Sequence, residues 1–226
     1  MAIRSFSGPY HTVGLVGRAG AGKDTCADIL AAHHGYARLA FADALKTELT
    51  NAFGVDPRLF SARHIKETPT ASLAIGRSTD ARFISYMVDT GHCPITPQSP
   101  RTLMRLWGTE YRRTLDSHDY WLLRAHETVE ELFMRGHRRL VITDIRFINE
   151  AAFARDLGAT IWRISRDLAN RTPATHLSET ELDLIAADRT LTNDGHLNQL
   201  VSTVLNACPF EQAFAKVTPN RQGIEQ

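Results

Sequence analysis

The sequence predicts an α/β fold in which helices cover both faces of a parallel sheet. Three observations predict it: short apolar runs alternate with stretches of helical spacing, a glycine-rich turn follows the first run, and an acid ends a later one. Strands that are separated by helices pair in parallel, and such sheets are buried on both faces. Ligands bind these sheets beyond the carboxyl ends of the strands, so we expect the functional site there.

Five short apolar runs are typical of buried strands. The first reads HTVGLV and leads directly into the glycine-rich turn, whereas the third, RLVITD, ends in Asp144. In chain order the predicted strands cover residues 11–16, 36–41, 139–144, 159–165 and 189–193.

Stretches of helical spacing fill most of the chain between these runs. Four of them stop at a glycine, which is a common helix C-cap. Ser99 and Pro100 supply a cap and a first-turn proline for another helix, in which Gly108 is expected to make a break. Asn149 is expected to cap the helix after the third strand. The predicted helices cover residues 24–34, 43–53, 99–115, 119–135, 149–157 and 196–207.

Length and composition predict one compact domain over residues 1–226, interrupted by an insertion. The chain is 43% hydrophobic and 23% charged, which is ordinary for a globular protein. Residues 55–98 show no firm period and are interpreted as the insertion. The formal net charge of +1 argues against a protein that binds nucleic acid through bulk electrostatics.

Neither a structural metal nor a membrane is expected as a partner. The three cysteines are widely spaced and fit no disulfide framework or cysteine zinc site, and the ten histidines form no ligand set. The N-terminus lacks the apolar stretch of a signal peptide, and no run approaches the ~20 apolar residues of a membrane helix. These features predict a soluble, cytoplasmic protein.

A phosphate-binding loop is predicted between the first strand and the first helix. The segment GRAGAGKDT, residues 17–25, has the Walker A spacing at every position but the last. Glycines let backbone N–H groups turn toward phosphate oxygens, and the N-terminus of the next helix attracts anions. Lys23 places a charge on the β- and γ-phosphates. The residues predicted to hold the nucleotide here are Arg18, Gly20, Gly22, Lys23, Asp24 and Thr25.

The loop departs from the general motif where a Ser or Thr usually binds magnesium. Asp24 stands at that position, and Thr25 follows it. Either the Thr25 hydroxyl takes the metal, or Asp24 holds the ion through water or orients the acceptor phosphate. A first-turn acid also stabilises the helix dipole, whatever else it does. The loop alone leaves the reaction open, because kinases, GTPases and ATPases share it.

Seven segments in order give the chain a resemblance to a known family. They are GKDT in the loop, SPRTLMRLWGTEYRR (99–113), DYW (119–121), VITDIRFINEA (141–151), LGATIWRISR (157–166), HLSETEL (176–182) and LTNDGHLNQL (191–200). The set resembles the deoxynucleoside monophosphate kinases of bacteriophages and prophages, strongest over residues 99–205, and that family shares the aspartate variant of the loop. Residues 55–98 match its pattern poorly.

The resemblance implies a three-layer nucleotide-kinase fold with an acceptor-binding part and a lid over about residues 166–180. The implied reaction moves the γ-phosphoryl group of ATP to a deoxynucleoside monophosphate, with Mg²⁺ as cofactor. The acceptor phosphate is already ionised near neutral pH, so positioning and charge neutralisation suffice. Such a site needs several cations, and arginine suits phosphate best. If the chain is phage-encoded, the expected compartment is the host cytoplasm. A homodimer is the oligomeric state that we consider.

Residue roles are assigned from the positions and chemistry of the side chains together with this resemblance, and for Arg63 and Lys66 a surface role is the alternative. Asp144 suits a magnesium-bound water, Arg146 the acceptor phosphate, and Glu150 the orientation of Arg146; a capping cluster is the alternative. The catalytic set is Lys23, Asp24, Asp144 and Arg146, and the metal set is Asp24, Thr25 and Asp144. Substrate binding is assigned to Arg63, Lys66, Thr109, Arg112, Trp121, Asp144, Arg146 and Glu150. Arg166 and Arg171 belong to the lid, and Asn193 lies beside the adenine.

Two other functions remain open at this stage. A dephospho-coenzyme A kinase, or another small-metabolite kinase, shares the core motifs. A P-loop regulator or nucleic-acid-stimulated ATPase belongs to a different class, and it is expected to carry more positive charge or an effector-type switch region. The sequence also leaves open which bases are accepted, and whether the sugar is deoxyribose or ribose.

Overall fold

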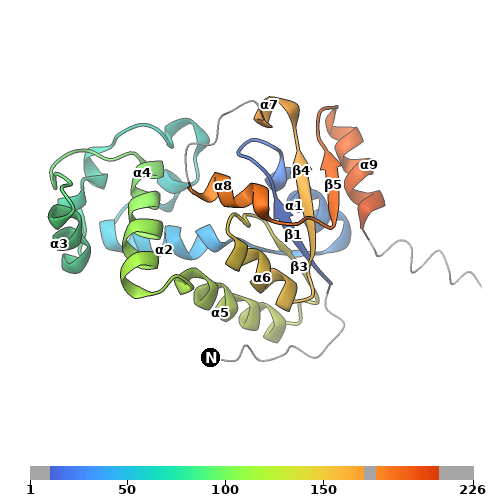
Figure 1. The fold of residues 1–226 in the computed structure, drawn as a ribbon, viewed down its shortest axis with the longest axis horizontal. Helices are drawn as coiled ribbons and strands as arrows, with labels where there is room; N and C mark the ends of the chain where they lie inside the picture. The colour runs from blue at the N-terminus through green and yellow to red at the C-terminus, as the bar shows by residue number, and fades with distance from the viewer. Residues whose placement is uncertain (1–10, 171–176, 209–226) are drawn as a thin grey trace, which may run out of the picture. The chain divides into compact units, whose positions relative to one another are not determined.

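The computed structural model of the chain describes residues 11–170 and 177–208. The chain divides into two compact units (Figure 1), one made of the residues up to Arg38 and from Arg138 onward, the other of Leu39–His137. Arg171 and the segment after Pro209 lie outside the described residues. The phosphate loop belongs to the first unit, and the predicted insertion, 55–98, belongs to the second.

The first unit is built on a five-stranded sheet with the order β2-β3-β1-β4-β5. Strand β1 pairs in parallel with both β3 and β4, and β4 pairs in parallel with β5. The first strand along the chain therefore lies at the centre of the sheet. The strands are β1 (His11–Val16), β2 (Ala37–Leu39), β3 (Arg139–Ile142), β4 (Thr160–Ser165) and β5 (Arg189–Thr192).

Helices cover both faces of this sheet, as the sequence predicts. Alternate residues of β1 point to opposite faces: Val13 and Leu15 pack with helices α1 and α9, whereas Thr12 and Gly14 face α6. A Cβ on Gly14 would lie 2.6 Å from Ile145 Cδ1, so α6 and the turn before it approach the strand closely. The helices of this unit are α1 (Lys23–His34), α6 (Ile148–Asp156), α7 (Asp167–Asn170), α8 (Leu177–Leu184) and α9 (Leu197–Ala207).

The second unit is helical and has its own core. Its α-helices are α2 (Phe41–Phe53), α3 (Ala81–Asp89), α4 (Pro100–Arg105) and α5 (Tyr120–Met134). Four short 3₁₀ segments are η1 (Pro57–Phe60), η2 (Arg63–Ile65), η3 (Ala71–Leu73) and η4 (Ile75–Arg77), and η5 (Leu106–Asp116) is a π-helix. The core is aromatic: Phe83 packs on Trp107 and Tyr111 with ring centroids 4.7 Å and 5.3 Å apart.

Two local predictions are wrong. Gly108 makes no break: α4 runs directly into η5, and Gly108 is buried inside that helix, where a Cβ would lie 3.2 Å from Leu45. Asn149 does not cap α6, because Phe147 is the N-cap residue and the Glu150 carboxylate accepts its backbone N–H at 3.2 Å. The Ser99 cap is confirmed, since its hydroxyl accepts the N–H of Thr102 at 3.2 Å.

Candidate functional site

The loop between β1 and α1 has a backbone that only glycine fits. Gly17 has φ 151° and Gly22 has φ 103°, and both values are strained for other residues. A Cβ on Gly17 would lie 2.4 Å from the Ile164 carbonyl oxygen, and one on Gly22 would lie 2.3 Å from Asn193 Nδ2. Helix α1 begins immediately afterward, at Lys23. The N-terminus of α1 therefore opens at the carboxyl end of the central strand.

Lys23 is half-buried and folds back over the loop. Its Nζ donates to the Gly17 carbonyl at 2.6 Å and to the Arg18 carbonyl at 3.1 Å. Burial, with the charge of Arg146 nearby, lowers the pKa of Lys23 to about 8, although Asp24 and Asp144 act in the opposite direction. The ammonium group is thus held inside the loop with little solvent to stabilise it.

Asp24 and Thr25 differ in their surroundings. Asp24 is exposed, and its carboxylate lies 3.7 Å from the guanidinium of Arg38 in β2. Arg38 also pairs with Asp28, one turn along α1. Thr25 is half-buried at the start of α1. Arg38, which was not predicted as a site residue, thus pairs with two acids on the exposed side of α1.

Two turns from elsewhere in the chain meet the loop. Asn193, after β5, donates from Nδ2 to the Ala21 carbonyl at 2.8 Å, and Arg166, after β4, lies 3.5 Å from the Gly20 carbonyl. Asp194 accepts the backbone N–H of Asp167 at 2.7 Å and so joins these two turns. Both Asn193 and Arg166 were predicted site residues, and the structure brings them to the loop.

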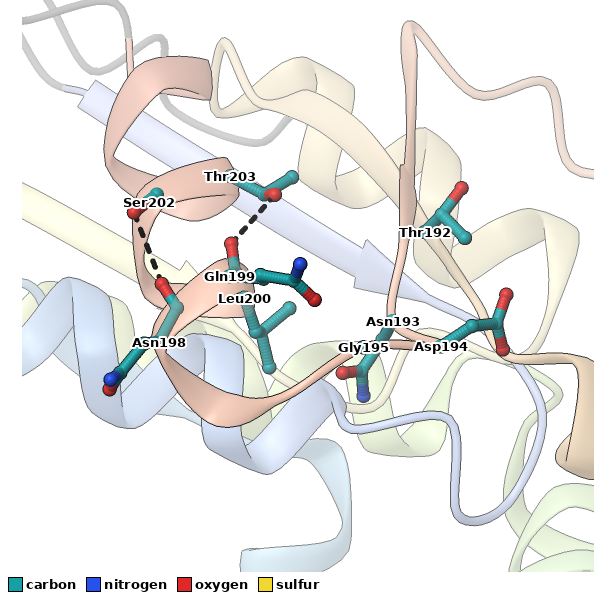
Figure 2. A pocket seen from close by; sticks show the side chains of 9 residues that line it. All are labelled: Thr192, Asn193, Asp194, Gly195, Asn198, Gln199, Leu200, Ser202 and Thr203. Atoms are coloured by element: carbon teal, nitrogen blue, oxygen red, sulfur yellow. Dashed lines mark hydrogen bonds between the residues drawn. The ribbon is translucent and has the colours of Figure 1, made fainter.

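A pocket of about 620 Å³ adjoins this junction (Figure 2). Residues 192–195 form one wall, and the first turns of α9 form the other. Ser202 and Thr203 donate their hydroxyls to carbonyls of their own helix. The pocket-lining residues of α9 are Asn198, Gln199, Leu200, Ser202 and Thr203.

The turn between β3 and α6 carries Asp144, Arg146 and Glu150. Both Asp144 and Arg146 act on the charge of Lys23, so they lie near the loop. Arg146 is exposed, whereas Glu150 is buried, at 3% exposure. Glu150 Oε2 accepts the backbone N–H groups of Arg146 at 2.8 Å and of Phe147 at 3.2 Å. The carboxylate thereby fixes the backbone that presents Arg146, which is a capping role.

In the second unit, the guanidinium of Arg112 contacts two carboxylates and several aromatic rings. Its Nε donates to Glu48 at 2.8 Å and its Nη1 to Asp116 at 2.9 Å. Its guanidinium carbon lies 4.9 Å from the ring centroid of Tyr111 and 5.0 Å from that of Tyr120. Burial lowers the pKa of Arg112, but the two carboxylates outweigh burial and raise it above the usual value.

Glu48, on α2, is the centre of this network and was missed from the sequence. Its carboxylate also accepts Trp107 Nε1 at 2.9 Å and the Tyr120 hydroxyl at 2.5 Å. Burial and the bond to Glu48 raise the pKa of Tyr120 to about 12. The one signal in the sequence is an acid beside the core position Leu49 in an otherwise amphipathic helix.

The other residues assigned to the acceptor lie in the second unit. Trp121 is 4% exposed, and its indole N–H donates to the Gly108 carbonyl at 2.9 Å, so its ring is part of the core. Thr109 is half-buried in η5 and offers its carbonyl to Thr114. Lys66 is half-buried, and its carbonyl accepts the backbone N–H of Arg101. Arg63 starts η2, and its side chain lies outside the described residues.

The oxygens at the loop suit a magnesium ion. Mg²⁺ prefers oxygen ligands and is usually held by one or two carboxylates together with substrate phosphates. Asp24 and Asp144 both act on the charge of Lys23, and Thr25 lies in the first turn of α1, so oxygen donors of this kind are present near the loop. Within residues 11–170 and 177–208, no three His, Cys, Asp or Glu side chains form a metal cluster. The donor set therefore fits an ion completed by phosphate oxygens.

None of the described helices has the length and apolarity to cross a membrane.

A glycine loop at the central strand, a lysine folded over it and carboxylates at the same edge define a P-loop nucleotide-binding protein. The family model of deoxynucleotide monophosphate kinases matches residues 84–204, which is more than half of the chain. The chain belongs to the deoxynucleotide monophosphate kinase family. It is an enzyme, a phosphotransferase of the nucleotide-kinase class, and this confirms the resemblance drawn from the sequence.

The chain is similar to two proteins that are named for this family and to one solved structure. A protein of Acanthamoeba polyphaga mimivirus, named "Putative deoxynucleotide monophosphate kinase", is 29% identical over 86% of this chain and 94% of its own length. The deoxynucleotide monophosphate kinase of Enterobacteria phage T4 is 30% identical over 48% of this chain and 44% of its own. Among solved structures, the dephospho-CoA kinase from Campylobacter jejuni aligns with a TM-score of 0.47 and 13% identity, covering 91% of this chain and 97% of that one.

Proposed function

We propose that this enzyme transfers the γ-phosphoryl group of ATP to a deoxynucleoside monophosphate and forms ADP and the diphosphate. The observation that carries the proposal is the position of Lys23, held over the glycine loop with Arg146 and Asp144 close enough to act on its charge. A triphosphate on this loop meets backbone N–H groups, the N-terminus of α1 and the ammonium group together.

The acceptor phosphate needs no strong base, because its oxygens are ionised near neutral pH. One of these oxygens attacks the γ-phosphorus, the bond to the β,γ-bridging oxygen breaks, and ADP leaves with the electron pair. In this proposal Lys23 neutralises charge on the β- and γ-phosphates, and Arg146 holds the acceptor phosphate in line. Mg²⁺, when bound by Asp24, Thr25 or Asp144 together with the phosphates, supplies further charge neutralisation.

The remaining parts of the site are assigned by the same reasoning. The pocket beside Asn193 is the proposed place of the adenine base. Asn193 bonds to the loop itself, and residues 192–195 at the end of β5 form one wall of the pocket (Figure 2). Residues 55–98 are proposed to complete the acceptor site, and residues 166–180 to form a lid that excludes water. The proposed compartment is the cytoplasm, that of the host if the chain is phage-encoded.

ATP consumption with a panel of acceptors tests the reaction. The panel contains the common deoxynucleoside monophosphates, their ribose counterparts and dephospho-coenzyme A, with nucleic acid as a separate addition. We expect ADP to form with at least one deoxynucleoside monophosphate and nucleic acid alone to have no effect. Turnover with dephospho-coenzyme A only, or stimulation by nucleic acid without an acceptor, contradicts the proposal.

Arg146→Ala separates the acceptor role from ATP binding. We expect this variant to lose at least about tenfold in kcat/KM for the monophosphate, because a charge-assisted clamp on phosphate is removed. Its affinity for ATP, measured by calorimetry, is expected to change much less. Arg155→Ala is a matched control, since Arg155 is an exposed arginine on α6 that pairs with Asp188. An unchanged kcat/KM in Arg146→Ala would remove the clamp.

The lowered pKa of Lys23 predicts that ATP binding takes up a proton in mildly alkaline solution. With a pKa of about 8 in the free enzyme, Lys23 is largely neutral above that pH, and bound phosphate favours the charged form. ATP affinity is therefore expected to fall as pH rises above 8. Calorimetry in buffers of different ionisation enthalpy measures the uptake. Lys23→Arg is the control, because arginine stays charged there; an equal pH dependence in this variant contradicts the prediction.

A further inference from the structure

The C-terminal half of α8 is firmly attached to the sheet of its own unit. Leu182 is 3% exposed and Ile185 is 5% exposed. From β4, Arg163 donates through Nη2 to the carbonyl of Leu182 at 3.1 Å and to that of Ile185 at 2.7 Å. The end of α8 is therefore held by both apolar burial and hydrogen bonds, which fix the backbone that carries its side chains.

Two acids on α8 contact two different segments near the proposed phosphate site, the start of α6 and the glycine loop. Glu181 Oε2 accepts the backbone N–H of Ile148, the first residue of α6, at 3.2 Å. Asp183 Oδ2 lies 2.9 Å from Nη2 of Arg18, the second residue of the glycine loop. Figure 1 shows α8 beside α6 in this unit. A carboxylate is thus paired with a cation in the loop that is proposed to receive a triphosphate.

We propose that Asp183 weakens nucleotide binding, because it competes with phosphate oxygens for Arg18. The proposal rests on the proposed function, which places ATP phosphates on this loop. A phosphate that takes Arg18 must break the pair with Asp183, and the fixed carboxylate also repels the triphosphate. Because the chain is anchored at Leu182 in α8 and at Ile185 just beyond its end, Asp183 is held near the loop.

The opposite role of Asp183, to order Arg18 for phosphate binding, makes an equally definite prediction. If the pair with Asp183 instead orders Arg18 for phosphate, then its removal weakens nucleotide binding. The sign of the change therefore distinguishes competition from preorganisation. The side chains of Arg18 and Asp183 are 21% and 53% exposed, and exposed pairs contribute at most about 1 kcal/mol. The expected gain on removing the carboxylate is accordingly about two- to fivefold in affinity.

Calorimetry with ATP tests the competition, using the full-length chain as wild type, Asp183→Asn, Arg18→Ala and the double variant. We expect Asp183→Asn to bind ATP about two- to fivefold more tightly at low ionic strength, with a smaller gain at high salt. In the Arg18→Ala background the same substitution is expected to give a clearly smaller gain, because the competed cation is gone. Asp156→Asn, an exposed acid at the end of α6, is the control and is expected to bind like wild type.

Unchanged or weaker binding by Asp183→Asn overturns the competition. An equal gain in the Arg18→Ala background overturns it as well. An equal gain in Asp156→Asn would also overturn it, because the change in net charge alone would then explain the tighter binding. Wild-type enzyme that binds no ATP refutes the proposed function itself. The two failures are therefore distinguishable, because the first requires a wild type that binds ATP normally.

Discussion

Replacing Lys23 with methionine is expected to slow phosphoryl transfer by about 10²- to 10³-fold while the protein stays folded. The ammonium group supplies the charge that the loop backbone lacks, and methionine keeps the length and the apolar contacts of the side chain. Activity measured with saturating ATP and monophosphate reports the loss in kcat. Transfer at the wild-type rate would remove the phosphate loop from the mechanism.

Stability supplies the control for this variant. The folded-state pKa of Lys23, about 8, lies below its ordinary value of 10.5, so the unfolded chain binds more protons between these two pH values. The burial cost is fully present below pH 8 and declines as the pH rises toward 10.5. Removing the charge is therefore expected to relieve a cost at neutral pH, so thermal unfolding should show no large loss of stability. A variant that is inactive because it is unfolded would show the opposite.

The phosphate loop could be predicted because its parts are contiguous in the sequence. Strand, glycines, lysine and helix follow one another within residues 11–34, and each is required by local backbone geometry or by phosphate chemistry. The strand order could not be read in the same way, since it depends on which helices pack on which face. The loop's contact with Asn193 joins residues 172 positions apart, and it was expected only from the family resemblance.

The second unit shows where sequence reasoning stops. Arg112 was predicted to bind substrate, but its partner Glu48 lies 64 positions earlier, and no spacing rule connects them. Trp121 has the same difficulty, because only packing shows that its ring is in the core. The π-helix η5 also escapes prediction, since patterns of 3.6 residues assume an α-helix, whereas here the backbone N–H of Ser117 bonds to the carbonyl of Arg112 five residues before.

Glu48 is expected to be essential for the stability of the second unit. It is the acceptor for Trp107, Arg112 and Tyr120, which belong to η5 and α5, while Glu48 itself belongs to α2. One carboxylate therefore ties three helical elements together. Its side chain is 21% exposed, so the three donors would not be fully compensated by water if it were removed.

Glu48→Ala is therefore expected to lower the free energy of unfolding by about 3 kcal/mol, because it leaves a half-buried guanidinium and two ring donors without this partner. Glu48→Gln, which keeps an acceptor but loses the charge, is expected to lie in between. Glu127→Ala is the matched control: Glu127 pairs with Arg124 on the exposed face of α5, and such a pair contributes at most about 1 kcal/mol. Urea denaturation followed by tryptophan fluorescence measures all three. Equal losses in Glu48→Ala and Glu127→Ala would mean that the network is a surface feature.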